Sequence, residues 1–334
     1  MTVTALVGAQ FGSEGKGVVA ARLASRFDAA VRTGGPNAGH TFRHDGQTYK
    51  MRQIPCAWIN PKCDLFLGAG AVIDPVLLVE EAKFTGRLPF IDRHAVVIDP
   101  EWRKMEEPLV ETIGSTAEGV GLARMTKIGR NGTGNLAMAE RWYKESSVDT
   151  VDMLWQRLQR NKRVLLEGTQ GSGLSLHHGD YPFVTSTDTN AAQLLADAGI
   201  APDWLQHTLL IARTFPIRVG GHSGPMFKEL DWADIPGAPT PERTTVTNRI
   251  RRIGMWDDDL FTRAIQLNEP CGVALTFADY IDPHVRTNAT HEWSDALWDL
   301  INRIERDVPV VLVGVGGADF QMVPWHRCAH GEEW

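Results

Sequence analysis

The stretch GAQFGSEGKG, residues 8–17, connects a short apolar run, VTALV (residues 3–7), to an Ala- and Leu-rich segment, KGVVAARLASRF (residues 16–27). The apolar run is typical of a buried strand, and the segment after it is typical of a helix. Between the two, glycines allow the backbone to approach an anion, Lys16 supplies a positive charge, and the start of the helix presents free N–H groups. The stretch therefore predicts a phosphate-binding loop at the carboxyl end of a strand.

This loop differs from the common P-loop at two positions. A G-x-x-x-x-G-K pattern that ends at Lys16 needs glycine at position 10, where the chain has Gln10. The Ser or Thr that follows the lysine in that pattern and binds Mg²⁺ is replaced by Gly17. A single glycine-rich turn is a weak signal, and on its own it also fits a tight turn that holds no ligand.

Further strands and helices alternate along the chain. RVLLEGTQG (residues 163–171), CGVALTFADY (271–280) and VVLVGVGG (310–317) are short apolar runs typical of buried parallel strands. DDDLFTRAIQLNE (257–269) and WSDALWDLINRIERD (293–307) have the pattern of helices. This alternation predicts an α/β fold with a mostly parallel central sheet and helices on both faces.

Composition excludes several classes of protein. Residues 1–334 contain no segment with the composition of a linker, which predicts a single domain. A net charge of −7 argues against a general nucleic-acid-binding protein, since such domains are usually basic. The N-terminus lacks the pattern of a signal segment, and the longest apolar stretch, VPVVLVGVGGA (308–318), is too short to span a bilayer. We therefore expect a cytoplasmic protein without a membrane partner.

A second glycine-rich loop, VRTGGPNAGHTF at residues 31–42, follows the first. The two loops resemble the opening of the adenylosuccinate synthetase family, which usually shows G-D-E-G-K-G and then N-A-G-H-T; the matching residues here are GSEGKG (12–17) and NAGHT (37–41). Motifs in this order are far more specific than a single loop, and they imply the P-loop-related fold of that family. The resemblance continues along nearly the whole chain in IGSTAEGVG (113–121), EGTQGSGLSLHHGDYPFVTSTDTN (167–190), TTVTNRIRRIGMWD (244–257) and TFADYID (276–282).

The resemblance implies a carbon–nitrogen ligase. Members of the family join L-aspartate to C6 of a 6-oxopurine nucleotide: a nucleoside triphosphate first phosphorylates O6, and the amine of aspartate then displaces phosphate. Phosphorylation turns a poor leaving group into a good one, and Mg²⁺ together with Lys16 spreads the charge of the moving phosphoryl group. The family also implies a homodimer in which Arg130 reaches the acceptor phosphate in the other subunit's site.

The resemblance also assigns roles to individual residues. It implies that His40 contacts the transferred phosphoryl group as a general acid, a role that suits a near-neutral pKa. The residues that would act on the reacting groups are Ser13, Lys16, His40 and Gln170. Those that would hold the donor nucleotide are Gly12, Ser13, Glu14, Gly15, Lys16, Gly17, Thr41, Phe277, Asp279 and Gly316. Those that would hold the acceptor nucleotide and aspartate are Asn37, Ser115, Thr116, Arg130, Gln170, Thr185, Thr247, Arg249 and Arg251. The Mg²⁺ ligands would be Ser13 and the Gly39 carbonyl.

Ser13 departs from the family pattern, because most members have a catalytic Asp at this position that takes the N1 proton of IMP. A serine hydroxyl is not a comparable base, but it is shorter and still offers a hydrogen bond. Guanine carries a 2-amino group beside N1 that hypoxanthine lacks, and a short hydroxyl leaves room for it. A bacteriophage-encoded branch of the family resembles this chain here and converts dGMP to N6-succino-2-amino-2′-deoxyadenylate, a precursor of 2-aminoadenine in DNA. The sequence therefore predicts dGMP as acceptor, and a phage origin would place the enzyme in the host cytoplasm.

The donor site departs from the family as well. The family's T-K-x-D motif recognises guanine through its Asp; here Asp279 remains but Phe277 replaces the lysine. The family's downstream S-T-G-P-D-R is GVGGADF (314–320) in this chain, without the Ser and the Arg. A phenyl ring stacks on any base, so we expect ATP or dATP as phosphoryl donor in preference to GTP.

Two alternatives stay open at this point. One is an ordinary adenylosuccinate synthetase that uses IMP and GTP and tolerates Ser13. The other is a non-catalytic nucleotide-binding paralogue, against which the joint presence of Lys16, His40 and Gln170 argues. The group that removes the N1 proton is not identified by the sequence.

Overall fold

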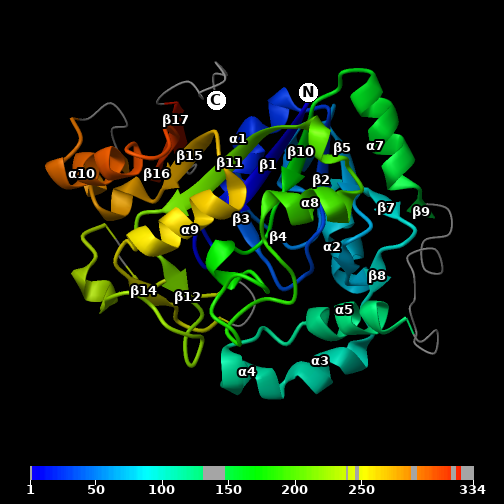
Figure 1. Ribbon diagram of the computed structural model, residues 1–334, viewed down its shortest axis with the longest axis horizontal. Helices are drawn as coiled ribbons and strands as arrows, with labels where there is room; N and C mark the ends of the chain where they lie inside the picture. Colours follow the sequence, from blue (N-terminus) through cyan, green and yellow to red (C-terminus); the bar gives the residue numbers. More distant parts are fainter. Residues whose placement is uncertain are drawn as a thin grey trace.

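One large sheet organises the molecule (Figure 1). The computed structural model describes residues 2–130, 147–237, 240–244, 248–286 and 292–316, and the backbone of 321–324. The strands of the large sheet are β1 (Val3–Gly8), β2 (Ala29–Arg32), β5 (Asp64–Leu67), β7 (Phe90–Asp92), β9 (Ser147–Val148), β10 (Val164–Glu167), β11 (Leu205–Arg213), β15 (Gly272–Thr276), β16 (Val310–Gly316) and β17 (Gln321–Pro324). Their order is β17-β16-β15-β11-β1-β10-β2-β5-β7-β9, and β17 alone among them runs antiparallel to its neighbour. The predicted mostly parallel sheet is confirmed.

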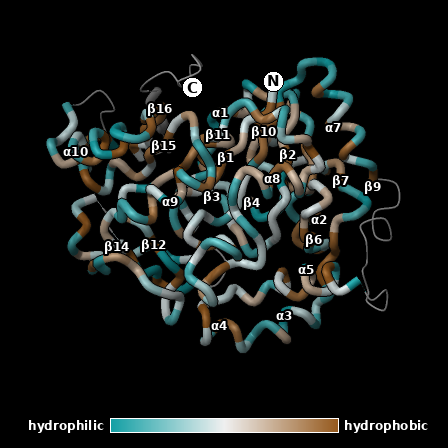
Figure 2. The backbone as a smooth tube through the Cα atoms, viewed as in Figure 1, coloured by the Kyte–Doolittle hydropathy of each residue, from teal (hydrophilic) through white to brown (hydrophobic). Residues whose placement is uncertain are grey.

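Two hydrophobic cores lie on opposite faces of this sheet. Along β1, Val3, Ala5 and Val7 belong to one core, whereas Leu6 belongs to the other, as the two-residue period of a strand requires. The first core is completed by α7 (Thr150–Gln159), α8 (Ala191–Ala198), α9 (Asp258–Asn268) and α10 (Asp295–Ile304). The second is completed by α1 (Lys16–Leu23) and α2 (Pro75–Thr85). Helices therefore cover both faces, as predicted, and Figure 2 shows apolar and polar residues alternating along surface helices such as α3 and α10.

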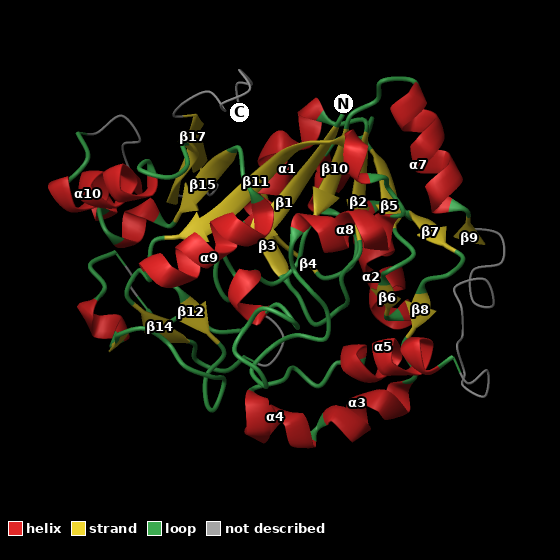
Figure 3. Cartoon of the chain, in the orientation of Figure 1, coloured by secondary structure: helices red, strands yellow, loops and turns green. Residues whose placement is uncertain are grey.

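Smaller elements surround the carboxyl ends of the central strands. Loops, green in Figure 3, fill the region between these strand ends and helices α3 and α4. The additional helices are α3 (Pro100–Glu106), α4 (Pro108–Ile113) and α5 (Val120–Gly129). The additional strands are β3 (His40–His44), β4 (Gln47–Met51), β6 (Val72–Ile73), β8 (Val96–Val97), β12 (Ile217–Arg218), β13 (Glu229–Leu230) and β14 (Arg252–Gly254). Short 3-10 helices are η1 (Ala24–Arg26), η2 (Cys56–Ile59), η3 (Ser172–Leu174), η4 (Pro202–Trp204), η5 (Trp232–Asp234), η6 (Ala278–Tyr280) and η7 (Pro283–Arg286).

The ends of the elements follow from local chemistry. Helix α9 begins after Asp257, whose side chain accepts a hydrogen bond from the Leu260 N–H at 3.1 Å. The strand predicted over residues 271–280 is wrong at its end: β15 stops at Thr276, because Phe277 takes a left-handed backbone with φ of 59°. That turn moves Phe277 out of the sheet and starts η6, which carries Asp279. No helix in the described part of the chain is long and apolar enough to cross a membrane.

We predict that Leu6→Ala destabilises the protein strongly. Leu6 is fully buried on a central strand, so the substitution removes apolar contacts on the α1 side of the sheet and leaves a cavity. The expected loss in the free energy of unfolding is about 2 to 5 kcal/mol. Urea unfolding followed by circular dichroism measures it, with Leu88→Ala, whose side chain is 48% exposed, as the matched control. Equal losses in the two variants would contradict the assigned core.

Candidate active site

Loops at the carboxyl ends of β1, β2, β10 and β15 form two adjoining pockets, as expected for an open parallel sheet. The two pockets share a boundary, which we call the shared rim, formed by Ser13, Lys16, Gly39, His40 and Arg251. The two glycine-rich loops recognised in the sequence thus meet at one place. All four residues predicted to act on the reacting groups line at least one pocket.

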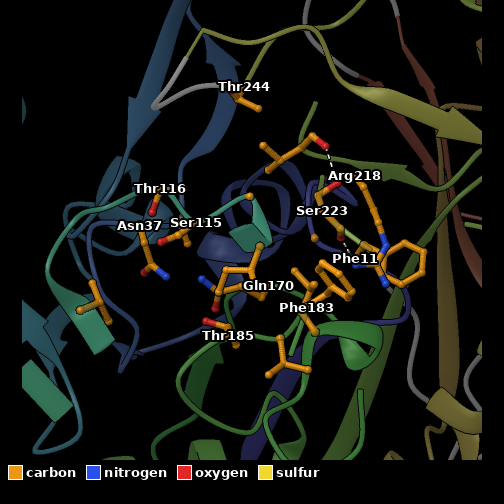
Figure 4. A pocket seen from close by; sticks show the side chains of 18 of the residues that line it. Phe11, Asn37, Ser115, Thr116, Gln170, Phe183, Thr185, Arg218, Ser223 and Thr244 are labelled. Atoms are coloured by element: carbon orange, nitrogen blue, oxygen red, sulfur yellow. Dashed lines mark hydrogen bonds between the residues drawn. The ribbon is translucent and has the colours of Figure 1, made fainter. Parts of the chain in front are cut away.

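The first pocket collects most of the residues predicted to hold the acceptor. In Figure 4, Asn37, Ser115 and Thr116 gather at one end, and Gln170 lies between them and the aromatic side chains at the other end. Thr185 also lines this pocket. A cluster of hydroxyl and amide groups suits the oxygens of a phosphate.

The aromatic end of the first pocket was not predicted from the sequence. The Arg218 guanidinium lies 3.8 Å from the centre of the Phe11 ring, and Phe183 lies nearby (Figure 4). Arg218 is buried, donates to the Ser223 carbonyl at 2.5 Å and pairs with Asp180 at 3.3 Å. Burial lowers the pKa of Arg218 to about 10, so the guanidinium stays charged at neutral pH.

The second pocket collects the residues predicted to hold the donor. With the exception of Gly12, which lines the first pocket instead, every predicted donor residue lines the second. The members outside the shared rim are Glu14, Gly15, Gly17, Thr41, Phe277, Asp279 and Gly316. The structure therefore separates the two predicted ligand sets into two neighbouring cavities.

Two predicted residues lie outside both pockets, and a third is not described. Arg130 ends α5 on the surface, and it lines neither pocket. Arg249 lines neither pocket and pairs with Glu111 at 2.7 Å. Thr247 lies outside the described residues.

Three residues that line the two pockets have left-handed backbones although they are not glycine. Ser13, Gln170 and Phe277 have φ values of 60°, 52° and 59°. Each follows a strand of the large sheet and lines a pocket. Such conformations cost on the order of 1 to 2 kcal/mol per residue, and they concentrate at functional sites.

Glu14 shapes the first loop. Its Oε1 accepts the backbone N–H groups of Gln10 at 3.0 Å and Gly12 at 2.8 Å, and its Oε2 pairs with Lys16 Nζ at 2.5 Å. Lys16 also donates to the Gln170 carbonyl. Glu14 is fully buried, and both its oxygens are engaged. It therefore positions Lys16 and is poorly suited to take a proton from a purine.

A buried carboxylate that sequence reasoning missed holds His40. Glu167 Oε1 lies 2.5 Å from His40 Nδ1 and 3.1 Å from Arg32 Nη1, and its Oε2 accepts the Cys56 N–H at 2.7 Å. Because Nδ1 of His40 points at the carboxylate, Nε2 is the ring nitrogen that can meet a ligand at the shared rim. The sequence did contain one signal for this role, because Glu167 is a charged residue at the end of the apolar run VLLE.

The close approach of α1 to His40 requires Gly17. A Cβ at position 17 would lie 2.6 Å from the Cβ of His40, too close for any side chain. Burial, with a further contribution from Arg32, lowers the pKa of His40 to about 4. The expectation of a near-neutral pKa is therefore wrong for the unliganded site. An anionic phosphate beside the ring would raise the pKa, since it favours the charged form.

The far end of the second pocket carries the aromatic and acidic pair predicted to meet the donor base. The Arg213 guanidinium lies 3.9 Å from the centre of the Phe277 ring, so one face of that ring is covered. Arg213 is fully buried and pairs with Glu242 at 2.6 Å, and Glu242 also accepts from the Tyr280 hydroxyl at 2.8 Å.

Arg251, in the shared rim, is poised for an anion. Burial lowers its pKa to about 10, which leaves it charged at neutral pH. Its Nε is buried and has no hydrogen-bond partner in the part of the chain that the structure describes. A buried N–H without a partner costs free energy, which an acceptor on a ligand would recover.

The oxygens of the shared rim suit Mg²⁺. The Ser13 hydroxyl and the Gly39 carbonyl are hard ligands of the kind that Mg²⁺ prefers. The only cluster of three metal-binding groups found among the described residues, His40, Cys56 and Glu167, is different in kind. Arg32 already pairs with that carboxylate, so a second cation would be repelled there.

We predict that stability falls as the pH is lowered from about 6.5 to about 4. An unfolded chain protonates His40 near pH 6.5, whereas the folded protein keeps the ring neutral until about pH 4. The unfolded state binds more protons in this window, so the free energy of unfolding decreases there, by up to about 3 kcal/mol. Urea unfolding at a series of pH values measures it. His40→Gln should flatten the profile and His94→Gln, at a half-exposed site, should not; an unchanged profile in His40→Gln would contradict the assignment.

Comparisons with known proteins agree with this geometry. A family model described as adenylosuccinate synthetase matches residues 5–141 and 133–297. The adenylosuccinate synthetase of Methanococcus vannielii is 37% identical over 294 residues, which cover 85% of this chain and 86% of the relative. That of Methanocaldococcus jannaschii is 34% identical over 331 residues, which cover 95% and 94%.

Two solved structures are also similar. The cyanophage S-2L succinoaminodeoxyadenylate synthetase (PurZ), bound to dGMP and to dATP as an energy donor, is 32% identical with a TM-score of 0.84; the match covers 97% of this chain and 95% of that one. Adenylosuccinate synthetase from Plasmodium falciparum has a TM-score of 0.82 at 21% identity, covering 98% and 100%, and it shows the fold alone. The chain belongs to the adenylosuccinate synthetase family and is a carbon–nitrogen ligase that joins aspartate to a purine nucleotide.

Proposed function

We propose that this enzyme ligates L-aspartate to C6 of dGMP, with ATP or dATP as phosphoryl donor, and forms N6-succino-2-amino-2′-deoxyadenylate. The observation that carries the proposal is the shared rim, in which a serine stands where the family's usual carboxylate would stand. The S-2L enzyme, which is similar over 97% of this chain, was solved with dGMP and dATP. Such a product would supply 2-aminoadenine for the DNA of a phage.

The two pockets suit transfer of a phosphoryl group between two nucleotides. The acceptor lies in the first pocket with its phosphate near Asn37, Ser115 and Thr116, and the triphosphate of the donor lies in the second pocket. The γ-phosphoryl group then passes through the shared rim, where the bond from phosphorus to its bridging oxygen breaks as the bond to O6 forms. The nucleoside diphosphate leaves, and the N1 proton of the purine is lost to solvent. Lys16 and Arg251 balance the negative charge in this place.

The second step completes the ligation. The amine of aspartate attacks C6, the C6–O6 bond breaks, phosphate leaves with O6, and the attacking nitrogen loses a proton. Arg251 and Arg249 bind the carboxylates of aspartate through guanidinium forks, and Thr247 is the third residue that the resemblance assigns to aspartate. Mg²⁺ held at Ser13 and Gly39 would neutralise charge on the phosphates. His40 meets the phosphoryl oxygens through the nitrogen that faces the shared rim, with Glu167 behind it, and Gln170 contacts the purine.

Ser13 is the residue that favours guanine over hypoxanthine. Its side chain is short, and its backbone is fixed, since Arg213 Nη1 donates to the Ser13 carbonyl at 3.2 Å. A carboxylate at this position would crowd a 2-amino group, whereas a hydroxyl leaves space and accepts a hydrogen bond from it. The proposal also includes a homodimer in which Arg130 completes the neighbouring subunit's phosphate site. A surface position outside both pockets is compatible with that role.

We predict faster turnover with dGMP than with IMP, and a reversal of this preference in Ser13→Asp. Release of phosphate is measured with Mg²⁺, aspartate and ATP against each acceptor. Ser13→Asp should lower kcat/KM for dGMP relative to IMP at least about tenfold, a change of about 1.4 kcal/mol. Ser13→Ala keeps the space for the 2-amino group but removes the hydroxyl. It therefore separates the contribution of the space from that of the hydrogen bond.

Each outcome of this assay has a clear meaning. Turnover with IMP alone would overturn the proposal and indicate an ordinary adenylosuccinate synthetase, as the curated relatives are named. Nucleotide binding without turnover on either acceptor would indicate a non-catalytic paralogue.

We predict that Glu167→Gln lowers kcat on the order of 100-fold, the low end of what general acid–base catalysis contributes, with KM changed little. The carboxylate raises the pKa of His40, so its loss should also shift the pH dependence of kcat to lower pH. The control is Asp64→Asn, which breaks the pair with Arg157 at the opposite end of the sheet. A fall in melting temperature with an unchanged pH profile would indicate a structural role alone.

A further inference from the structure

The carboxylate of Asp279 presents two unequal oxygens at the base end of the second pocket. Oδ2 accepts two hydrogen bonds from Arg286, from Nε at 3.0 Å and from Nη2 at 2.5 Å. Oδ1 is buried and has no hydrogen-bond partner among the residues that the structure describes. Both residues line the second pocket. One oxygen of the carboxylate is therefore paired within the protein, and the other has no partner among the described residues.

Arg286 is held firmly in this position. Its Nη2 also donates to the Gly237 carbonyl at 2.8 Å, and it belongs to η7, directly after the loop that carries Asp279. Gly237 packs against the backbone of Asp279 so closely that a Cβ there would lie 1.7 Å from the Asp279 carbonyl oxygen. The Gly237 N–H also donates to the Tyr280 carbonyl at 3.1 Å. The pair is thus part of a fixed backbone arrangement.

We propose that Arg286 sets the base preference of the phosphoryl donor by occupying Oδ2 of Asp279, so that the site favours a 6-aminopurine nucleotide over a guanine nucleotide. This inference rests on the proposed function for the identity of the second pocket as the donor site. It adds a specificity-determining residue, and it explains how a site that retains the Asp selects a different base.

The physical reason is the number of free lone pairs. A carboxylate recognises guanine best when its two oxygens accept from N1–H and from the 2-amino group together. Two charge-assisted bonds from Arg286 use both lone pairs of Oδ2, which leaves Oδ1 alone. The 6-amino group of adenine needs only one acceptor. Guanine would keep a donor unpaired in a buried site, and a site that leaves a polar group unpaired rejects the ligand strongly.

Charge balance supports the same conclusion. Burial raises the pKa of Asp279, and the positive charge of Arg286 opposes that shift. The same positive charge cancels much of the carboxylate's attraction for the electron-poor N1–H edge of guanine. Phe277, beside it, has one ring face against Arg213 and contributes no polar group that distinguishes the bases. Glu242 and Tyr280 also line this pocket, but they are paired with each other, and Glu242 also pairs with Arg213. The Asp279–Arg286 pair is therefore the group that we assign to reading the hydrogen-bond pattern of the base.

The test compares donors in Arg286→Leu. The wild-type enzyme should prefer ATP to GTP, and Arg286→Leu should raise kcat/KM for GTP relative to ATP at least about tenfold, because Oδ2 becomes free. Arg286→Lys keeps one positive charge but not the two-bond geometry, so it should give a smaller shift in the same direction. Arg303→Leu, which removes an exposed arginine from α10, is the matched control and should leave the ratio unchanged.

The acceptor in this test is whichever of dGMP and IMP the wild type turns over, so failure of the acceptor assignment does not affect the result. Calorimetric titration of the folded variants with non-hydrolysable ATP and GTP analogues repeats the comparison without turnover. Melting temperatures check folding, and Arg286→Lys serves if Arg286→Leu does not fold. A wild type that prefers GTP, or a ratio that neither variant changes, would overturn the inference.

Discussion

The buried Glu167 carboxylate is the interaction on which the site depends. It lies at the carboxyl end of β10, in the centre of the large sheet, and it binds groups from three other parts of the chain. Arg32 comes from the end of β2, His40 from the start of β3, and the Cys56 N–H from η2. The charge would be expensive to bury alone, and these three partners make its burial tolerable. The second glycine-rich loop is fixed between Arg32 and His40, and its position follows from this network.

A single boundary between two cavities explains why so few residues carry the chemistry. Ser13, Lys16, Gly39, His40 and Arg251 each line both pockets. On the proposed assignment of the pockets, a phosphoryl group that moves from one to the other stays within reach of the same charges throughout. The rest of the sheet supplies rigid support, and the left-handed turns after the strands aim the backbone at the ligands.

Much of the fold was predictable, because hydrophobic period and glycine position report directly on buried strands and the loops that follow them. The strand at 164–167 and the helix at 258–268 lie within the predicted segments. Most residues of the predicted donor and acceptor sets line the two pockets, while the roles assigned to them stay predictions. What the sequence did not indicate were contacts between distant segments: Glu167 behind His40, Arg218 on Phe11, and Arg286 on Asp279. The spacing of residues along the chain cannot predict such pairs, because they form only when the folded sheet brings distant segments together. The pKa of His40 was missed for the same reason, as burial depends on the whole fold.

The left-handed backbone at position 13 limits which residues evolution can place there. Asp, Asn and Gly tolerate that conformation well, whereas β-branched side chains such as Thr and Val are strongly disfavoured. Ser and Asp are both small, polar and compatible with the turn, so an exchange between them needs no rearrangement of the loop. On the acceptor selectivity that we propose for Ser13, a lineage can therefore pass between two acceptor chemistries through a change at one position without rebuilding the turn. The geometry of one turn would make this position a branching point for new function.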